Sequence, residues 1–449
     1  MTTFSRTLKP FQTTGRDFLC SKYHALLADD MGTGKTTQVL AAVHKLNLGR
    51  VAVVCPASVR SNWKQEIADC MGPSALNRFV VDSYNAAANN KFPGGPYDAV
   101  IPDEAHYLKT PDSQRTQAIF GNENGLVRKA KIKWALTGTP VLNRPSEIYP
   151  LASSLFGSAL SPYGTRKAFE QRFCGAYFDG RGINAKGATH LDDLQNRLAP
   201  FMLRRTKAEV LPQLPPRIVQ RFALDGVTEQ DLAPVFALEA EIANREAYLS
   251  STHEDYAQLG DTSRMDKALG VAKARAVAEF VDDLIETTGR KVVVITRHRE
   301  VVHLLDQALG HQLPVTYVGG MGDEAKRESI KTFQTDKDCF VIIGNMQAIG
   351  TGVDGLQKAS CDIVFAEFSW CPKEIEQCMD RLHRIGQSAA AVNVYIPHVP
   401  GTLESAKLQV NWNKSVVIKK LFGGSLFGEN NAIVAPSEAD MDLILGSIL

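Results

Sequence analysis

The residues best suited to chemistry lie near the start of the chain, where Gly34, Lys35 and Thr36 end a glycine-containing turn between an apolar strand and an apolar helix. Backbone amides in such a turn close around phosphate, the lysine supplies positive charge, and the threonine hydroxyl can ligate Mg²⁺. Asp29 stands where the usual GxxxxGK[ST] pattern has its first glycine. We therefore predict a phosphate-binding loop with an altered beginning. Its expected nucleotide contacts are Asp30, Met31, Gly32, Thr33, Gly34, Lys35, Thr36 and Thr37.

A second reactive group consists of Asp103 and Glu104, which follow the apolar segment 97–102. Ligands of open α/β sheets bind at the carboxyl ends of the strands, so both acids are expected in a ligand-binding crevice. There Asp103 would hold Mg²⁺ together with Thr36, and Glu104 would orient and deprotonate the attacking water. Acidic residues also favour helix N-termini, but the order of the two motifs favours catalysis. Pro102 removes a ladder donor, which predicts that the strand ends there.

The second half of the chain contains residues that could complete a nucleotide site. Gln377, Arg381 and Arg384 are spaced i, i+4 and i+7, which predicts that one helix face carries all three. Such a face is usually a solvated surface. Here it would supply an arginine finger for the γ-phosphate, which the first half lacks. Gly352 and Asp354 lie in a loop with three glycines that precedes this helix.

Gln12 lies upstream of the phosphate loop, in a segment (8–19) whose apolar residues have helical spacing. Its side chain has one acceptor oxygen and an amide that donates two hydrogens, enough to pair with the edge of an adenine. A packed amphipathic helix is the simpler interpretation of the segment. The position just before a phosphate loop favours adenine recognition.

The apolar pattern predicts the elements that position these groups. Continuous apolar runs such as 51–55 are typical of parallel strands that are buried on both faces. Similar runs recur in both halves, separated by helix-sized segments, so we predict an α/β fold with two parallel sheets flanked by helices. The expected strands lie within 50–67, 77–84, 97–109 and 130–151 in the first half and within 291–298, 314–320, 338–345 and 361–368 in the second.

A proline-rich break near 211–216 predicts the boundary between two domains, 1–210 and 211–449. Helical insertions are expected at about 152–200 and 228–285, and a C-terminal brace at about 401–449. Thr137 and Thr139 stand at a strand end beside the acids, where hydroxyls could relay the nucleotide state to the second domain. A simple Thr/Gly/Pro turn is the alternative interpretation.

Composition excludes several classes of protein. With 44% hydrophobic and 22% charged residues, the chain is typical of a soluble globular protein. A net charge of +1 confines any nucleic-acid surface to local patches. The 8 cysteines include no CxxC pair, which favours reduced structural thiols over a zinc site or a disulfide framework. The sequence shows no signal-peptide core and no apolar run of bilayer length, so we expect a cytoplasmic protein without membrane contacts.

The chain resembles the Swi/Snf-related group of the second helicase superfamily, from about Leu8 to Gly424. The motifs that carry the resemblance are, in order, LKPFQ, LLADDMGTGKTTQ, VVCPASVRSNWKQE, DEAH, LTGTP, FMLRRTKAEVLPQLPP, NMQAIGTGVDGLQKA and QCMDRLHRIGQ. The segments 143–149 and VFAEFSW are similar to the corresponding segments of the HepA-related annealing-helicase branch. The resemblance covers only the motor core of that branch. The chain departs from the family pattern at Cys371, Cys378 and Asp354, and none of these changes removes a catalytic group.

The resemblance implies two RecA-like lobes with ATP and Mg²⁺ in the cleft between them, completed by Arg381 and Arg384. It also implies nucleotide contacts from Gly352 and Asp354, which lie in the segment similar to motif V of the family. It also implies a monomeric, ATP-dependent translocase on double-stranded DNA that remodels or reanneals DNA or displaces bound proteins. Contacts with the DNA backbone would be salt-sensitive and would read little sequence. A bare motor core suits a bacterial or phage protein. The residues expected to contact DNA are Ser58, Arg60, Ser83, Arg297, Asn345 and Gln347.

Two other functions stay open at this point. A strand-separating helicase needs a separation pin, and the segment 157–200 leaves room for one. An ATP-gated DNA-binding switch needs no general base, so the intact Glu104 argues against it. Arg204 and Arg205 also keep two interpretations, a contact with DNA or a brace between the lobes.

Overall fold

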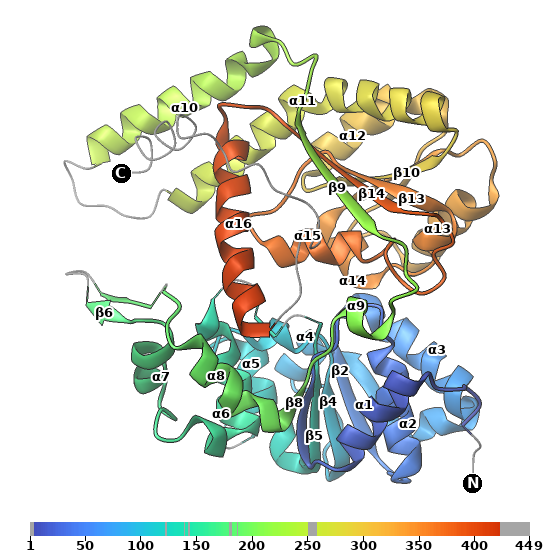
Figure 1. The fold of residues 1–449 in the computed structure, drawn as a ribbon, viewed down its shortest axis with the longest axis vertical. Helices are drawn as coiled ribbons and strands as arrows, with labels where there is room; N and C mark the ends of the chain where they lie inside the picture. The colour runs from blue at the N-terminus through green and yellow to red at the C-terminus, as the bar shows by residue number, and fades with distance from the viewer. Residues whose placement is uncertain are drawn as a thin grey trace. The chain divides into compact units, whose positions relative to one another are not determined.

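The computed structural model describes residues 4–121, 124–138, 140–141, 144–178, 182–185, 187–249 and 258–422 (Figure 1). Thr139, Asn143 and the C-terminal part of the expected brace, 423–449, lie outside these residues. The chain forms two compact units, of which unit 1 comprises Met1–Leu214 with Lys414–Ser425, and unit 2 comprises Pro215–Asn413 with Leu426–Leu449. No helix within the described part of the chain is long and apolar enough to cross a membrane.

Unit 1 is built on a six-stranded sheet in which every strand pair is parallel, with the order β3-β2-β4-β5-β1-β8. The strands are β1 (His24–Leu27), β2 (Val51–Cys55), β3 (Phe79–Ser83), β4 (Tyr97–Pro102), β5 (Ala130–Leu136) and β8 (Met202–Leu203). All five residues of β2 are buried, as expected for a central parallel strand with both faces covered. The predicted α/β fold class is therefore confirmed for this unit. Strand β4 ends at Pro102, as its missing N–H predicts.

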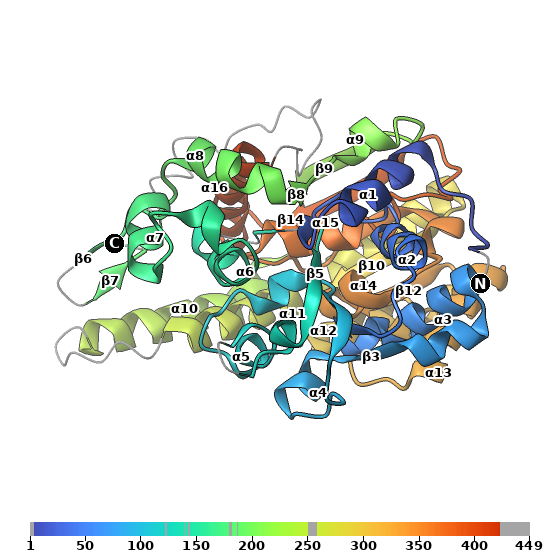
Figure 2. The same ribbon diagram turned by 90° about the horizontal axis from the view of Figure 1, so that it is seen from below.

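Helices cover both faces of this sheet (Figure 1, and Figure 2 from below). One face packs against α1 (Pro10–Cys20), α2 (Lys35–Lys45) and α3 (Arg60–Met71). The other packs against α4 (Tyr84–Ala88), α5 (Gln114–Phe120), α6 (Tyr149–Leu155), α7 (Arg166–Phe173) and α8 (Leu191–Leu198). A short antiparallel hairpin, β6 (Tyr177–Phe178) and β7 (Ile183–Asn184), lies between α7 and α8, and α9 (Lys207–Val210) follows β8.

Unit 2 contains a second parallel six-stranded sheet, with the order β11-β12-β10-β13-β14-β9. Its strands are β9 (Arg217–Ala223), β10 (Lys291–Thr296), β11 (Val315–Tyr317), β12 (Val341–Asn345), β13 (Ser360–Phe365) and β14 (Val392–His398). Its helices are α10 (Glu229–Leu249), α11 (Gln258–Thr288), α12 (Arg299–Ala308), α13 (Asp323–Thr335), α14 (Met346–Gly352) and α15 (Pro372–Met379). Helix α16 (Leu403–Phe422) begins in unit 2, and its residues from Lys414 on belong to unit 1. Four strands were predicted, and β9 and β14 were missed. Strand β9 lies at the sheet edge, where none of its residues is fully buried, and its sequence accordingly lacks a continuous apolar run.

One helix prediction is wrong. The expected helix through Gln377, Arg381 and Arg384 ends at Met379, and both arginines lie in the turns that follow. The N–H groups of Arg381 and Leu382 bond to carbonyls only three residues back, so the chain tightens and leaves the helix. Guanidinium contacts with the carbonyls of Gly350 and Val353 stabilise this turn. Tertiary contacts therefore override the helical spacing.

Candidate nucleotide-binding site

The strand order of unit 1 brings the predicted phosphate loop and the two acids to one edge of the sheet. Strand β5 lies between β1 and β4, and all three run parallel. Leu136, the last residue of β5, is level with Leu27 of β1 and forms a bridge with Asp103 after β4. The loop that follows β1 and the acids that follow β4 therefore leave the sheet at the same height. This is the carboxyl edge, where parallel sheets bind ligands.

The phosphate loop leads directly into α2, whose N-cap is Gly34. Gly34 adopts the left-handed conformation at φ 77°, and a Cβ there would lie 2.6 Å from Nε2 of Gln12. Both facts require glycine at this position. Gln12 is buried, donates from Nε2 to the Thr33 carbonyl at 3.1 Å, and accepts from the Lys9 N–H at 3.0 Å. In this structure Gln12 supports the loop, and adenine recognition stays a prediction.

The Lys35 ammonium is held by the beginning of its own loop. Its Nζ donates to the carbonyls of Asp29 at 2.8 Å and Asp30 at 3.1 Å. Gly138, which follows β5, comes so close that a Cβ there would lie 3.3 Å from Nζ and 2.5 Å from Cγ of Met31. The lysine thus lies between the loop and the end of β5, and α2 presents the loop amides to a phosphate group.

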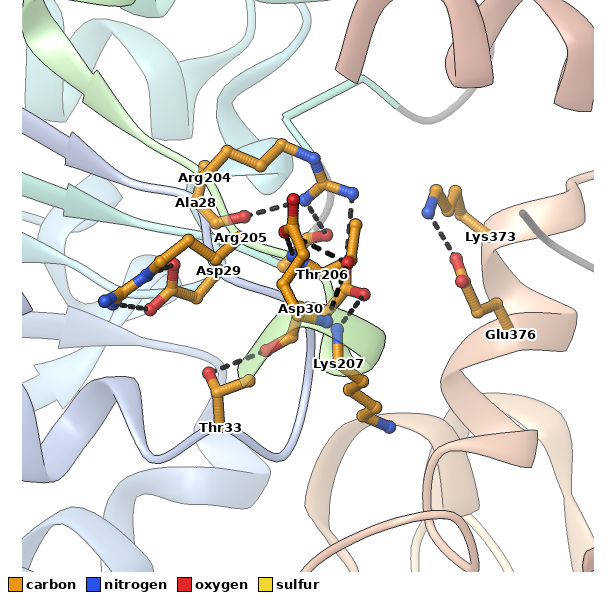
Figure 3. A network of polar contacts seen from close by, with 12 residues as sticks. Ala28, Asp29, Asp30, Thr33, Arg204, Arg205, Thr206, Lys207, Lys373 and Glu376 are labelled. Carbon is orange, nitrogen blue, oxygen red and sulfur yellow. Dashed lines mark hydrogen bonds and ion pairs between the residues drawn. The ribbon is translucent and has the colours of Figure 1, made fainter. Parts of the chain in front are cut away.

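Asp29 and Asp30 are each anchored by an arginine that follows β8 (Figure 3). The Asp29 side chain is fully buried, and its carboxylate accepts hydrogen bonds from Nε (3.0 Å) and Nη2 of Arg205. Asp30 accepts from Nη2 of Arg204 at 3.0 Å and from the Lys207 N–H at 3.0 Å. Arg204 also binds the carbonyl of Ala28 at 2.7 Å. The aspartate in place of the first loop glycine is therefore an ion-pair partner that fixes the loop.

Parallel pairing of β8 with β1 places these arginines beside the loop, since Leu203 is level with Leu27. Arg205 further donates to the carbonyl of Phe11 at 2.7 Å and to Oε1 of Gln38 at 3.1 Å. These contacts lie within unit 1. Arg204 and Arg205 were expected either to contact DNA or to brace the two lobes. The contacts seen here are of neither kind, since they are made with the phosphate loop and, for Arg205, also with α1 and α2.

The Asp103 carboxylate is oriented by two N–H donors. Nε1 of Trp63 donates to Oδ2 at 2.7 Å, and the Glu104 N–H donates to Oδ1 at 2.9 Å. The Tyr84 hydroxyl holds the Asp103 carbonyl at 2.7 Å. Burial, followed by repulsion from Glu104, raises the pKa of Asp103 to about 6, while the Trp63 N–H and the Lys35 charge act in the opposite direction.

Glu104 occupies a left-handed backbone conformation at φ 52°, which is uncommon for a residue other than glycine. Such strain often accompanies functional side chains. Its Oε2 lies 3.3 Å from Nδ1 of the buried His106, and the same ring nitrogen lies 3.1 Å from Oγ1 of Thr137. His106 therefore joins the candidate general base to the residue that follows β5.

The chemistry of the donors fits Mg²⁺. Thr36 in the first turn of α2 offers a hydroxyl, and Asp103 offers a carboxylate whose oxygens each keep a further acceptor position. Mg²⁺ prefers hard oxygen ligands and is usually held by one or two protein groups together with substrate phosphates. Thr36 and Asp103 would hold the ion on the protein side.

Unit 2 gathers its predicted nucleotide residues around α14 and the segment after α15. Arg384 lies 3.3 Å from Oδ1 of Asp354, and Arg381 donates to the carbonyls of Gly350 and Val353. Burial alone would raise the pKa of Asp354, but the charge of Arg384 brings that pKa below its ordinary value. Gln377 is buried in α15, and Gly352 is the last residue of α14.

The residues predicted to contact DNA lie at strand ends in each unit. Cys55 and Ser83 end neighbouring strands at the same level, with Ser58 and Arg60 just beyond β2. In unit 2, Thr296 and Asn345 likewise end two neighbouring strands at the same level. Arg297 directly follows Thr296, and Gln347 lies two residues after Asn345. Several already have protein partners, since Arg60 pairs with Asp82 at 3.0 Å and Arg297 with Asp266 at 2.6 Å. Ser83 and Asn345 cap α4 and α14 through their side chains.

Three positions were missed as parts of this site. Trp63 gave no signal because one buried apolar residue on an amphipathic helix is normal. Arg204 and Arg205 were noticed as a basic cluster that could contact DNA or brace the lobes, because their partners lie 174 and 176 residues away in sequence. The one clue in the sequence was Asp29, an acidic residue in place of the expected glycine, which pairs with Arg205 in the structure.

Comparison with known proteins gives consistent matches along the chain. Residues 11–93 and 86–233 match the SNF2-related domain, and residues 273–386 match the helicase conserved C-terminal domain. The chain is 30% identical over 436 residues to the DNA annealing helicase and endonuclease ZRANB3 of Bos taurus, covering 89% of this chain and 39% of that protein. It is 31% identical over 422 residues to a SWI/SNF-related matrix-associated actin-dependent regulator of chromatin, subfamily A-like protein 1, of Xenopus tropicalis, covering 88% and 43%.

The chain spans about two fifths of the length of these curated relatives. Among solved structures, it is similar to the SWI2/SNF2 ATPase core of Sulfolobus solfataricus in complex with double-stranded DNA, with a TM-score of 0.42 and 20% identity. That comparison covers 99% of this chain and 98% of the other.

Proposed function

Since the chain belongs to the SNF2-related family of ATP hydrolases, we propose that it uses ATP hydrolysis to move along double-stranded DNA. The movement would remodel or reanneal DNA or displace bound proteins. The observation that carries the proposal is the meeting of Lys35, Asp103 and Glu104 at one sheet edge. This arrangement would supply a phosphate cradle, a metal ligand and a general base in one place.

Each residue would have a distinct role in hydrolysis. Lys35 and the loop amides would bind the β- and γ-phosphates, and Glu104 would orient the attacking water and accept its proton. Mg²⁺, bound with ATP by Thr36 and Asp103, would neutralise the charge that develops on the phosphates. Arg381 and Arg384 would act as arginine fingers. They would then exchange their present carbonyl contacts for phosphate oxygens.

Translocation would follow if hydrolysis requires residues from both units, because the ATP cycle then alternates two conformations. The relatives named annealing helicases support action on DNA, as do the polar residues at the strand ends of both sheets. Contacts from Ser58, Arg60, Ser83, Arg297, Asn345 and Gln347 would be with the phosphate backbone. Binding would therefore weaken with salt and depend little on sequence.

A strand-separating helicase is a second candidate, favoured by the β6–β7 hairpin. Tyr177 is 61% exposed, Phe178 71% and Ile183 64%. Neighbouring strand residues point to opposite faces, so Tyr177 and Phe178 place aromatic rings on both faces of the hairpin. Apolar side chains of this kind can insert between bases and unstack them.

An ATPase assay with matched nucleic acids tests the proposal. We expect slow hydrolysis by the protein alone and strong stimulation by blunt double-stranded DNA, with less by single-stranded DNA. Equal stimulation by RNA, or no stimulation by any nucleic acid, would contradict double-stranded DNA translocation. Stimulation confined to forked DNA, lost when Tyr177 and Phe178 are replaced by Ala, would favour the helicase.

A further inference from the structure

Unit 1 contains two buried tryptophans whose indole N–H groups have different partners. Trp63 is 2% exposed and donates from Nε1 to a carboxylate oxygen, Oδ2 of Asp103, at 2.7 Å. Trp134 is fully buried and donates from Nε1 to a backbone carbonyl, that of Lys22, at 2.9 Å. The first bond reaches the candidate metal ligand, while the second ties β5 to the turn after α1.

The Trp63 bond determines how the Asp103 carboxylate is turned. An indole N–H only donates, and it is held rigidly here because Trp63 packs in the core between α3 and the sheet. With Trp63 on Oδ2 and the Glu104 N–H on Oδ1, rotation of the carboxylate would break at least one bond. Each oxygen keeps one acceptor position for a further ligand.

The same bond makes Trp63 an outer partner of the candidate metal ligand, because its N–H contacts Oδ2 of Asp103 and leaves the other acceptor positions of the carboxylate to the ion. Outer partners of this kind orient metal-binding carboxylates. Such partners are not visible in motif patterns because they touch the ligand and not the metal.

We propose that Trp63 is a positioning residue of the nucleotide site, which holds the Asp103 carboxylate in the orientation that Mg²⁺ requires. The proposal rests on the proposed function only in taking Asp103 as the metal ligand. It requires neither DNA binding nor translocation. Replacement of Trp63 by Phe removes the N–H and keeps an aromatic ring, and replacement of Trp134 by Phe is the matched control.

The test measures binding of a fluorescent ADP analogue by anisotropy while Mg²⁺ is titrated, without DNA. Partners of metal ligands typically change metal affinity about 10- to 100-fold. We expect Trp63→Phe to need about tenfold more Mg²⁺ for half-maximal binding, with unchanged nucleotide affinity in EDTA. Trp134→Phe should need the same Mg²⁺ as the unaltered protein. A Mg²⁺ requirement for Trp63→Phe within twofold of the Trp134→Phe value would overturn the proposal.

A second variant separates the N–H from side-chain volume. Benzothienylalanine at position 63 keeps the bicyclic shape and replaces N–H by sulfur, so it answers the question if Trp63→Phe does not fold. It should show the same raised Mg²⁺ requirement, and a normal requirement would overturn the proposal. A protein that shows the Mg²⁺ effect but no stimulation by DNA would contradict the proposed translocation and leave the role of Trp63 supported.

Discussion

Arg205 and Asp29 form a buried two-point ion pair, although they are 176 residues apart in the sequence. The aspartate belongs to the beginning of the phosphate loop, and the arginine lies two residues before α9, the last helix before unit 2 begins. Lys35 binds the carbonyls of the same two aspartates whose carboxylates bind Arg204 and Arg205. A phosphate that attracts Lys35 therefore acts on the residues that the arginines hold.

Replacement of Arg205 by Ala should destabilise the protein and weaken nucleotide binding. Removal of one partner from a buried ion pair leaves an uncompensated charge, which typically costs about 3–5 kcal/mol. Urea unfolding and titration with the fluorescent ADP analogue measure the two effects. The control is Arg166→Ala, because the half-exposed Arg166 pairs with Glu170 one turn along α7, where the loss should be at most about 1 kcal/mol. Similar losses in both variants would show that Arg205 does not hold the loop.

Replacement of Glu104 by Gln should preserve ATP binding and abolish turnover. The amide keeps the size of the side chain but cannot accept a proton from water. Equilibrium binding of ATP and steady-state hydrolysis with double-stranded DNA measure the two properties. A variant that still turns over at a substantial rate would show that Glu104 is not the general base.

Loss of Arg384 should lower the hydrolysis rate far more than ATP affinity. An arginine finger stabilises charge in the transition state and is worth about 10³- to 10⁵-fold in rate in related phosphoryl-transfer enzymes. Single-turnover rates and ATP binding should be compared for Arg384→Ala and for Arg299→Ala, whose arginine also donates to a backbone carbonyl in unit 2. An unchanged rate in Arg384→Ala would leave Arg381 as the only finger among the two candidates.

Much of the site was predictable because its chemistry depends on local patterns. Lys35 follows a glycine turn, and Asp103 follows an apolar strand, so sequence order alone placed both at strand ends. The partners that orient these residues were not predictable. Trp63 and Arg205 act through contacts between distant segments, and the strand β8 that precedes the arginines has only two residues.

The turn after α15 shows the opposite failure. The spacing of Gln377, Arg381 and Arg384 fitted one helix face, but the helix ends at Met379. The spacing of residues shows only which side chains would share a face if the segment were helical. It contains no information about the carbonyls of Gly350 and Val353, which accept hydrogen bonds from the arginines. The prediction that one helix carries all three residues was therefore wrong, since only Gln377 lies in α15.

Replacement of Glu367 by Gln should destabilise unit 2 in a pH-dependent manner. The buried carboxylate accepts the N–H groups of Arg297 and His298 and lies 2.6 Å from Nδ1 of His298. Burial alone would raise the pKa of Glu367, but these donors bring it below the ordinary value. A depressed carboxyl pKa stabilises the fold above the ordinary value, and the stabilisation is lost as the pH falls through the depressed value.

At pH 7 we therefore expect a loss of about 2 kcal/mol in Glu367→Gln, typical of hydrogen bonds to a charged group. Urea unfolding at several pH values should show the difference from the unaltered protein shrinking below about pH 4. A difference that stays constant down to pH 3 would show that the charge of Glu367 contributes nothing.

Displacement of a third DNA strand from a triplex tests the central claim most directly, because a protein that moves along duplex DNA removes the third strand without separating the duplex. We predict that the protein with ATP displaces the third strand and leaves a forked duplex paired, and that Glu104→Gln displaces nothing. The account is contradicted if ATP is hydrolysed on the triplex substrate while the third strand stays bound, or if Glu104→Gln displaces it equally well.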